Sequence, residues 1–278
     1  MSTVAITAAD VNKLRQITGA GMMDCKKALT EAGGDFEAAI DILRKKGQKV
    51  AGNRADREAN EGVVLAKVNG DSTRAVLVAL NCETDFVAKN QEFIDFTNKI
   101  SDVALNGNFA DTEALLDFSM DGRAIRDQIT DLVGKIGEKM ELQYAALTGA
   151  YNVAYNHPGN RLATIIAFNK IVDGIAEVGK DVAMQAAAMA PVALDKDDVD
   201  ARTLDRELEI AREQIRQEGK PEEMVEKIAQ GKLAKFYKES TLLNQEFIKD
   251  NKLSVRQYVQ SKDKELAVTG FRRIAIGN

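Results

Sequence analysis

The apolar positions of the first fifty residues recur every three or four places, and this spacing predicts three short amphipathic helices. Thr7 with Asp10 three residues later resembles a capping box at the start of the first helix. Asp35 is placed to cap the third helix and Gly47 to end it. Residues 45–61 are polar and without period, which predicts a linker. The three apolar stripes are Val11, Leu14 and Ile17, then Met22, Cys25 and Leu29, then Phe36, Ala39, Ile40 and Leu43.

From Gly62 the apolar pattern changes from helical spacing to alternation. Residues 63–68 and 74–80 are rich in β-branched side chains, and they flank Asn69-Gly70-Asp71, a sequence typical of a β-hairpin turn. Residues 140–147 predict a further strand. Two helices are predicted in between, with apolar stripes at Phe93, Phe96, Ile100 and Val103, and at Ile125, Ile129, Leu132 and Ile136.

A similar pattern occurs again later in the chain. Residues 161–169 form an apolar run like that of residues 74–81, and each run leads into a predicted helix. The apolar stripe of the later helix is Ile175, Val178, Val182 and Met189. Two such strand–helix units are typical of a duplicated α+β subdomain, but any α+β protein also alternates strands and helices, so both interpretations stay open.

Residues 195–239 are highly charged, with 13 acidic and 10 basic side chains. Narrow apolar seams on either side of Gly219-Lys220-Pro221 predict two helices joined by a tight turn. Such a hairpin buries little of its own surface, so we expect it either to project toward a partner or to be a solvated surface element. Residues 241–248 and 266–276 predict strands that close the second sheet. The seams consist of Leu204, Leu208, Ala211 and Ile215, and of Met224 and Ile228.

Composition narrows the class of protein. Of the 278 residues, 45% are hydrophobic and 29% charged, which allows a folded core and excludes a disordered chain. The formal charge of −5 argues against a general nucleic-acid binder, although residues 1–54 alone contain 9 basic and 6 acidic side chains. Two cysteines and one histidine are too few for a closed zinc site. Neither a secretory signal nor a membrane-spanning run is visible, so we expect a cytoplasmic protein without metal or cofactor.

The sequence offers little for covalent catalysis. His157 is the only histidine, it lies in a predicted turn, and no nucleophile motif or phosphate-binding glycine loop is present. We therefore expect that the protein is not an enzyme. Between a strand and a helix, Thr84-Asp85-Phe86-Val87 places an acceptor beside a rigid aromatic ring. The ordinary interpretation of this segment is that Asp85 caps the next helix and Phe86 belongs to the core.

Five segments of the chain resemble the bacterial elongation factor Ts family. Residues 18–29, TGAGMMDCKKAL, are similar to its N-terminal signature, and residues 81–90, NCETDFVAKN, to its second signature. Their order and spacing fit the family from Ile6 to Ile276. The other three segments are Gly219-Lys220-Pro221, residues 231–236 and residues 268–271.

This resemblance implies a particular α+β architecture. Residues 1–55 would form a ubiquitin-associated-like three-helix module with its linker, followed by a core of two similar α+β subdomains at 56–145 and 146–278. The second subdomain would carry an inserted antiparallel coiled-coil hairpin at 195–237. Many family members continue into a further helical module, whereas this chain stops at Asn278, so contacts of that module would be absent or replaced.

The resemblance also implies a guanine-nucleotide exchange factor for elongation factor Tu. Such a protein binds its partner in the GDP-bound and the nucleotide-free state, promotes GDP release and allows GTP to rebind. The residues Thr84, Asp85, Phe86 and Val87 match the family segment that intrudes beside the partner's nucleotide site and disturbs its Mg²⁺. No direct nucleotide binding, nucleic-acid binding or membrane binding is expected.

Further residues are implied as contacts with the same partner. His157 matches a family histidine that helps to move the partner's phosphate-binding loop. The helical module would dock on the partner's GTPase domain through Leu14, Arg15, Met22 and Met23, with one of the two methionines packed inward and the other free.

A binding module without exchange activity, such as a translation-associated scaffold, is the alternative. Such a protein would bind the GTPase equally well with and without GDP, and a ligand indifferent to two states shifts neither.

Overall fold

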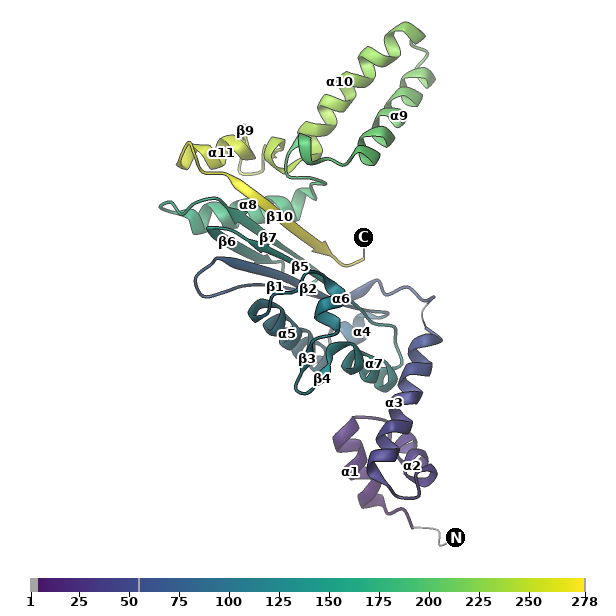
Figure 1. The fold of residues 1–278 in the computed structure, drawn as a ribbon. Coiled ribbons are helices and arrows are strands. Elements are labelled where there is room, and N and C mark those ends of the chain that lie inside the picture. The colour runs from purple at the N-terminus through teal and green to yellow at the C-terminus, as the bar shows by residue number, and fades with distance from the viewer. Residues whose placement is uncertain (1–4, 55, 278) are drawn as a thin grey trace. The chain divides into compact units, whose positions relative to one another are not determined.

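The structure is a computed structural model that describes residues 5–54 and 56–277 (Figure 1). It contains both helices and strands and begins with three helices, which confirms the predicted α+β class. The described residues form two compact units, the first within 1–65, 78–145 and 275–278, and the second within 66–77 and 146–274. The predicted boundary at residue 55 lies outside the described residues. None of the described helices combines the length and the apolar character needed to cross a membrane.

The N-terminal helices are α1 (Ala8–Thr18), α2 (Met22–Glu31) and α3 (Phe36–Gly52). The predicted capping box is confirmed, because Asp10 N donates to Thr7 Oγ1 at 3.2 Å while Thr7 N donates to the Asp10 carboxylate at 3.1 Å. Asp35 caps α3 by accepting from Ala38 N at 2.9 Å. The apolar stripes meet in a small core made of Val11, Leu14, Cys25, Ala28, Leu29 and Ala39.

The third helix is longer than predicted. Gly47 was expected to end it, but α3 continues to Gly52, so the first part of the predicted linker is helical. Gly47 is buried where α3 packs on α7 (Ile125–Ile136), and a Cβ on Gly134 of α7 would lie 2.8 Å from Gly47 Cα. The two glycines let the helix backbones approach closely, which offsets the low helix propensity of glycine.

A three-stranded sheet follows, in the order β1 (Glu61–Val68), β2 (Arg74–Cys82) and β5 (Glu141–Thr148). The predicted hairpin between the first two strands is confirmed, since Asn69 N donates to Arg74 O and Arg74 N to Asn69 Oδ1, at 3.0 and 2.9 Å. Strand β2 is buried from its second residue to its last. The chain therefore leaves the buried interior only after Cys82, the last residue of this strand.

The remaining helices of the first unit include both amphipathic helices predicted there. Phe93 and Ile100 of α5 and Ile129 of α7 are buried, as their spacing predicts. Helices α5 and α7 lie on the same side of the sheet (Figure 1). The elements are α4 (Asp85–Ala88), α5 (Gln91–Asn106), α6 (Thr112–Leu116), β3 (Ser119–Met120), β4 (Arg123–Ala124) and α7.

The second unit is built on another three-stranded sheet. Strands β6 and β7 pair antiparallel, with Tyr151 opposite Phe168 and Asn156 opposite Ala163. The apolar side of α8 packs on this sheet, where Val178 and Val182 share a core with Phe168. The order is β10-β7-β6, and the elements are β6 (Tyr151–Asn156), β7 (Leu162–Phe168), α8 (Ile175–Met189) and β10 (Val268–Ala275).

The charged region forms two helices, α9 (Ala201–Gln217) and α10 (Glu222–Ser240), which lie side by side and are joined by a short turn (Figure 1). Ile215 and Val225 are buried between them, and Arg212 pairs with Glu226 at 2.9 Å on the flank. A 3-10 turn at Lys196–Asp198 precedes the first of the two helices.

Of the two strand predictions for the closing of the second sheet, one is wrong. Residues 268–275 do form a strand of that sheet, but residues 241–248 form a 3-10 turn and the two-residue strand β8, which pairs with β9. The side chain of buried Gln245 donates to the carbonyls of Met189 and Glu239, and hydrogen bonds from side chain to backbone compete with a sheet ladder. The elements are Leu242–Asn244, β8 (Glu246–Phe247), β9 (Asp250–Ser254) and α11 (Val255–Lys262).

Candidate functional site

The segment Thr84–Val87, called here the 84–87 segment, comprises the N-cap and the first three residues of the one-turn helix α4, which begins shortly after the end of β2. Thr84 is the N-cap of this helix, because its Oγ1 accepts from Val87 N at 3.4 Å. Such a cap satisfies one of the free backbone N–H groups of a first helical turn. The chain thus leaves a fully buried strand and enters a helix within three residues.

Phe86 is exposed over 84% of its surface. The ordinary interpretation, in which Asp85 caps the helix and Phe86 belongs to the core, is therefore wrong on both counts, since Thr84 is the cap and the ring faces solvent. An aromatic ring has a large apolar area to bury, so a ring held in solvent on a short, defined turn is available to a partner.

Asp85, beside this ring, carries a negative charge at neutral pH. Lys89, one helical turn later, donates to its carboxylate at 2.6 Å, and this bond lowers the pKa of Asp85 below its ordinary value. Both side chains are well exposed. The segment therefore presents an ionised acceptor next to an apolar ring.

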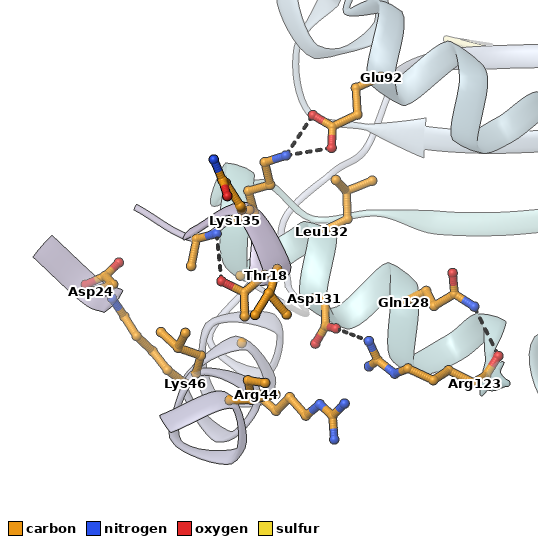
Figure 2. Close-up of a pocket in the computed structure, with 18 of the residues that line it drawn as sticks. Thr18, Asp24, Arg44, Lys46, Glu92, Arg123, Gln128, Asp131, Leu132 and Lys135 are labelled. Atoms are coloured by element: carbon orange, nitrogen blue, oxygen red, sulfur yellow. Dashed lines mark hydrogen bonds and ion pairs between the residues drawn. The ribbon is translucent and has the colours of Figure 1, made fainter. Parts of the chain in front are cut away.

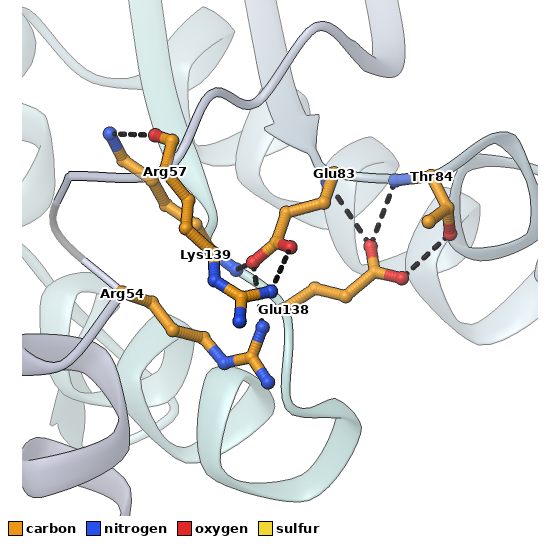
Figure 3. A network of polar contacts seen from close by, with 6 residues as sticks. All are labelled: Arg54, Arg57, Glu83, Thr84, Glu138 and Lys139. Atoms are coloured by element: carbon orange, nitrogen blue, oxygen red, sulfur yellow. Dashed lines mark hydrogen bonds and ion pairs between the residues drawn. The ribbon is translucent and has the colours of Figure 1, made fainter.

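Two glutamates attach the 84–87 segment to the chain that follows α7 (Figure 3). The Glu138 carboxylate accepts from Glu83 N at 3.1 Å, from Thr84 N at 3.0 Å and from Thr84 Oγ1 at 2.6 Å. The Glu83 carboxylate in turn accepts from Lys139 N at 2.6 Å. Each glutamate thus binds backbone of the other's segment.

Two arginines in the chain just after α3 bind the same Glu83. Arg54 and Arg57 donate to its two carboxylate oxygens at 3.0 and 2.9 Å (Figure 3). Burial by itself would raise the pKa of Glu83, but the hydrogen bonds from Lys139 N, Arg57 and Arg54 outweigh it and lower this pKa to about 2. The carboxylate stays ionised over the whole physiological range.

Reasoning from the sequence missed this network. Glu83 lies inside the second signature, and its position between a buried strand and Thr84 was the available signal. For Glu138 the sequence contained no such signal, because its bond to Thr84 joins positions 54 residues apart. This bond also depends on a turn at Gly137, which adopts φ +82° at the end of α7.

The two cysteines are buried thiols. Burial, followed by the nearby Glu138 charge, raises the pKa of Cys82 to about 12, so the thiol stays protonated at neutral pH. It donates to Thr84 O at 3.2 Å. Its role at this site is therefore to support the backbone rather than to react.

His157 belongs to the second unit and lies in the predicted turn, directly after β6. Its backbone N–H donates to Leu162 O at 2.9 Å, and its Nδ1 lies 2.9 Å from Tyr155 Oη. The ring is exposed, so it is available to a partner.

The helical module presents both of its predicted methionine contacts. Met22 is 53% and Met23 66% exposed, so the expectation that one packs inward is wrong. The packed stripe of α2 begins at Cys25, and the first turn of the helix extends past the core. Arg15 is also exposed, whereas Leu14 is fully buried and supports this surface from inside.

A cavity of about 610 Å³ lies between the helical module and helices α5 and α7 (Figure 2). Ile17, Phe96 and Leu132 contribute its apolar lining. Most of its charged groups are paired with one another, so the cavity lacks the cluster of like charges that would favour a phosphate or a metal ion. The pairs are Asp24 with Lys46, Asp131 with Arg123, and Glu92 with Lys135.

Metal chemistry finds no support in the part of the chain that the structure describes. Within residues 5–54 and 56–277, no group of three or more His, Cys, Asp or Glu side chains is arranged to hold a metal ion.

The arrangement of the 84–87 segment suits insertion into a partner, since it combines an exposed ring, an ionised acceptor and a fixed backbone.

Comparison with known proteins gives the family. The family model described as Elongation factor TS matches residues 83–278. The protein named Elongation factor Ts of Christiangramia forsetii is 53% identical over 273 residues, covering 98% of this chain and 99% of the relative. Those of Flavobacterium psychrophilum and Cytophaga hutchinsonii are each 54% identical, the latter covering 99% of this chain and 100% of the relative. The chain that carries the 84–87 segment therefore belongs to the elongation factor Ts family.

Proposed function

We propose that this protein is a guanine-nucleotide exchange factor that binds elongation factor Tu·GDP, promotes GDP release and allows GTP to rebind during translation elongation. One observation carries the proposal: Phe86 is 84% exposed on a one-turn helix, beside the ionised Asp85. Membership of the elongation factor Ts family supports the choice of partner.

The exposed ring acts as a wedge in this proposal. Phe86 enters between helices of the GTPase beside its nucleotide site and shifts the groups that hold Mg²⁺, while Asp85 supplies a competing negative charge. Thr84 and Val87 shape the segment from below. Removal of a divalent ion exposes the phosphates to their mutual repulsion, because the ion is the largest local charge in such a site.

The energies involved are compatible with a wedge aided by docking. Each tenfold loosening of GDP requires about 1.4 kcal/mol, and burial of one phenylalanine supplies about 2–3 kcal/mol. An exchange factor needs several such tenfold steps, so other surfaces must contribute. Linkage makes the effect reciprocal: GDP must weaken binding of this protein as much as this protein weakens binding of GDP.

The further contacts come from both units. We propose that Arg15, Met22 and Met23 dock on the GTPase domain, while buried Leu14 keeps their surface in shape. His157 contacts the partner near its phosphate-binding loop and helps to move that loop. The proposal also includes the domain organisation that the family resemblance implies. Residues 1–55 form a ubiquitin-associated-like module, residues 56–145 and 146–278 form the two core subdomains, and residues 195–237 form a coiled coil.

The proposed reaction contains no covalent step. Exchange proceeds through non-covalent contacts alone, so the protein is not an enzyme in the sense of bond chemistry and needs neither a cofactor nor a metal ion of its own. The proposed partner is a protein, without nucleic acid or membrane, and the proposed compartment is the cytoplasm, where elongation takes place.

The test is the release rate of a fluorescent GDP analogue from elongation factor Tu in a stopped-flow instrument. A large acceleration that saturates with the concentration of this protein is expected. Binding without acceleration, and with equal affinity for the GDP-bound and the empty GTPase, would instead identify a scaffold.

A further inference from the structure

Glu138 ties down the point at which β2 gives way to α4. Its three hydrogen bonds end on two successive backbone N–H groups and on the Thr84 hydroxyl, at 2.6–3.1 Å (Figure 3). A carboxylate only accepts hydrogen bonds, and bonds to an ionised acceptor are stronger than neutral ones. Three donors that share one carboxylate leave this part of the backbone little freedom.

The helix beyond this point has little support of its own. Helix α4 is four residues long, and none of its side chains is buried. A single helical turn is not stable in water without outside contacts, because nucleating a helix costs more than its first hydrogen bond returns. The direction of the Phe86 ring therefore depends on how firmly Thr84 is held.

Glu138 is itself held in place from the opposite side. The preceding Gly137 turns the chain at the end of α7, and the following Lys139 N donates to the Glu83 carboxylate at 2.6 Å. Arg54 and Arg57 fix the two oxygens of Glu83. The clamp is thus reciprocal, with Glu83 and Glu138 each binding the other's backbone.

We propose that Glu138 is a positioning residue for nucleotide exchange, which fixes the direction in which Asp85 and Phe86 leave the sheet. This inference rests on the proposed function of the 84–87 segment. A segment that is ordered before binding loses less conformational freedom when it enters the partner, so more of the contact energy remains for displacing GDP. Glu138 touches neither the partner nor the nucleotide in this account and acts through Thr84.

Nucleotide exchange by Glu138 variants tests the role. Glu138→Ala is expected to lower the maximal GDP release rate on the order of tenfold. The concentration for half-maximal acceleration should stay within about twofold, because the docking surfaces are untouched. Glu138→Gln should be intermediate, since its amide oxygen still accepts from the two backbone N–H groups while its NH₂ forces the Thr84 hydroxyl to reverse. Asp127→Ala, at an exposed carboxylate on α7, is the matched control and should match the wild type.

A fluorescence measurement reports the position of the ring without the partner. The chain contains no tryptophan, so Phe86→Trp introduces a sole indole emitter at the tip of the segment. Its anisotropy should fall when Glu138→Ala is added, with an unchanged far-ultraviolet circular dichroism spectrum. A general loss of structure would change both signals, so the pair separates local loosening from unfolding.

The outcomes distinguish this inference from the function on which it rests. If Phe86→Ala exchanges GDP like the wild type, the wedge itself fails. If Phe86→Ala is defective while Glu138→Ala is not, or if the anisotropy is unchanged by Glu138→Ala, the wedge stands and the positioning role of Glu138 is overturned.

Discussion

The two junctions at which a buried strand leads into a helix, after β2 and after β7, are built alike. An asparagine side chain binds the backbone of another segment at each junction; Asn81 is the second-to-last residue of β2, and Asn169 directly follows β7. Asn81 donates to Ala59 O at 3.0 Å, and Asn169 donates to Glu265 O at 2.8 Å while accepting from Ala267 N at 2.9 Å. The two apolar runs that resemble each other in the sequence therefore end in similar local structures.

The side chains that follow these asparagines differ. The first junction presents acidic Asp85 with Phe86, held by a carboxylate that binds backbone. The second presents basic Lys170, paired with Asp263 at 3.0 Å, and Ile171, which is 64% exposed. Because both junctions expose an apolar side chain, exposure alone does not mark a functional site. The combination of an aromatic ring, a negative charge and a fixed backbone occurs at the first.

The largest expected difference between the junctions is in nucleotide exchange. Phe86→Ala removes the ring and should slow GDP release from elongation factor Tu by about 30- to 150-fold, which corresponds to about 2–3 kcal/mol of lost burial in the complex. Ile171→Ala is the matched control at the second junction and should leave the rate unchanged. Both side chains face solvent, so neither change should alter the urea midpoint of unfolding noticeably. An equal loss of exchange in the two variants would remove the distinction drawn here.

A smaller difference is expected in stability. Asn81 is 7% exposed and also accepts from Gln143 Nε2 at 3.2 Å, so Asn81→Ala leaves buried polar groups without partners and should cost about 1–3 kcal/mol. Asn169 is exposed, water can replace its bonds, and Asn169→Ala should cost less than about 1 kcal/mol. Urea unfolding monitored by circular dichroism measures both. Equal costs would mean that burial does not separate the two junctions.

A third difference is expected in the pH dependence of stability. The pKa of Glu83 is about 2 in the folded protein and ordinarily 4.5, so the folded state binds fewer protons in this range. The stabilisation is present above pH 4.5 and is lost as the pH falls toward 2. Glu83→Gln should lower the free energy of unfolding at pH 7 and flatten its decline over this window. Asp263→Asn, at the more exposed ion pair of the second junction, should change the slope less. If the free energy of unfolding fell with the same slope against pH in wild type and Glu83→Gln, the low folded-state pKa of Glu83 would be contradicted.

Much of the fold could be predicted from the sequence, because its longer elements have strong apolar periods. The helix around Phe93 and Ile100 and the hairpin around Asn69 follow from local patterns. The helical continuation past Gly47 could not be predicted, since it depends on a close approach to Gly134, far along the chain. The strand prediction for residues 241–248 was wrong for a similar reason: the bonds of Gln245 to carbonyls outside this segment override the strand pattern.

The candidate site was predictable only in part. The signature residues gave the position of Asp85 and Phe86, but the pattern alone allowed a buried ring, and only the packing of the fold shows it in solvent. Glu138 was out of reach, since hydrogen bonds between distant segments leave no periodic trace in a sequence. Residues that position a site are therefore harder to predict than residues that touch the partner.

The measurement that tests the account most directly is a double-mutant cycle of Phe86→Ala and Glu138→Ala, read as the GDP release rate from elongation factor Tu. If Glu138 acts by aiming Phe86 together with Asp85, the double variant should lose less than the product of the two single losses, because without the ring only Asp85 is left to aim. Two losses that multiply, or a Phe86→Ala protein as active as the wild type, would contradict the account of an anchored aromatic wedge.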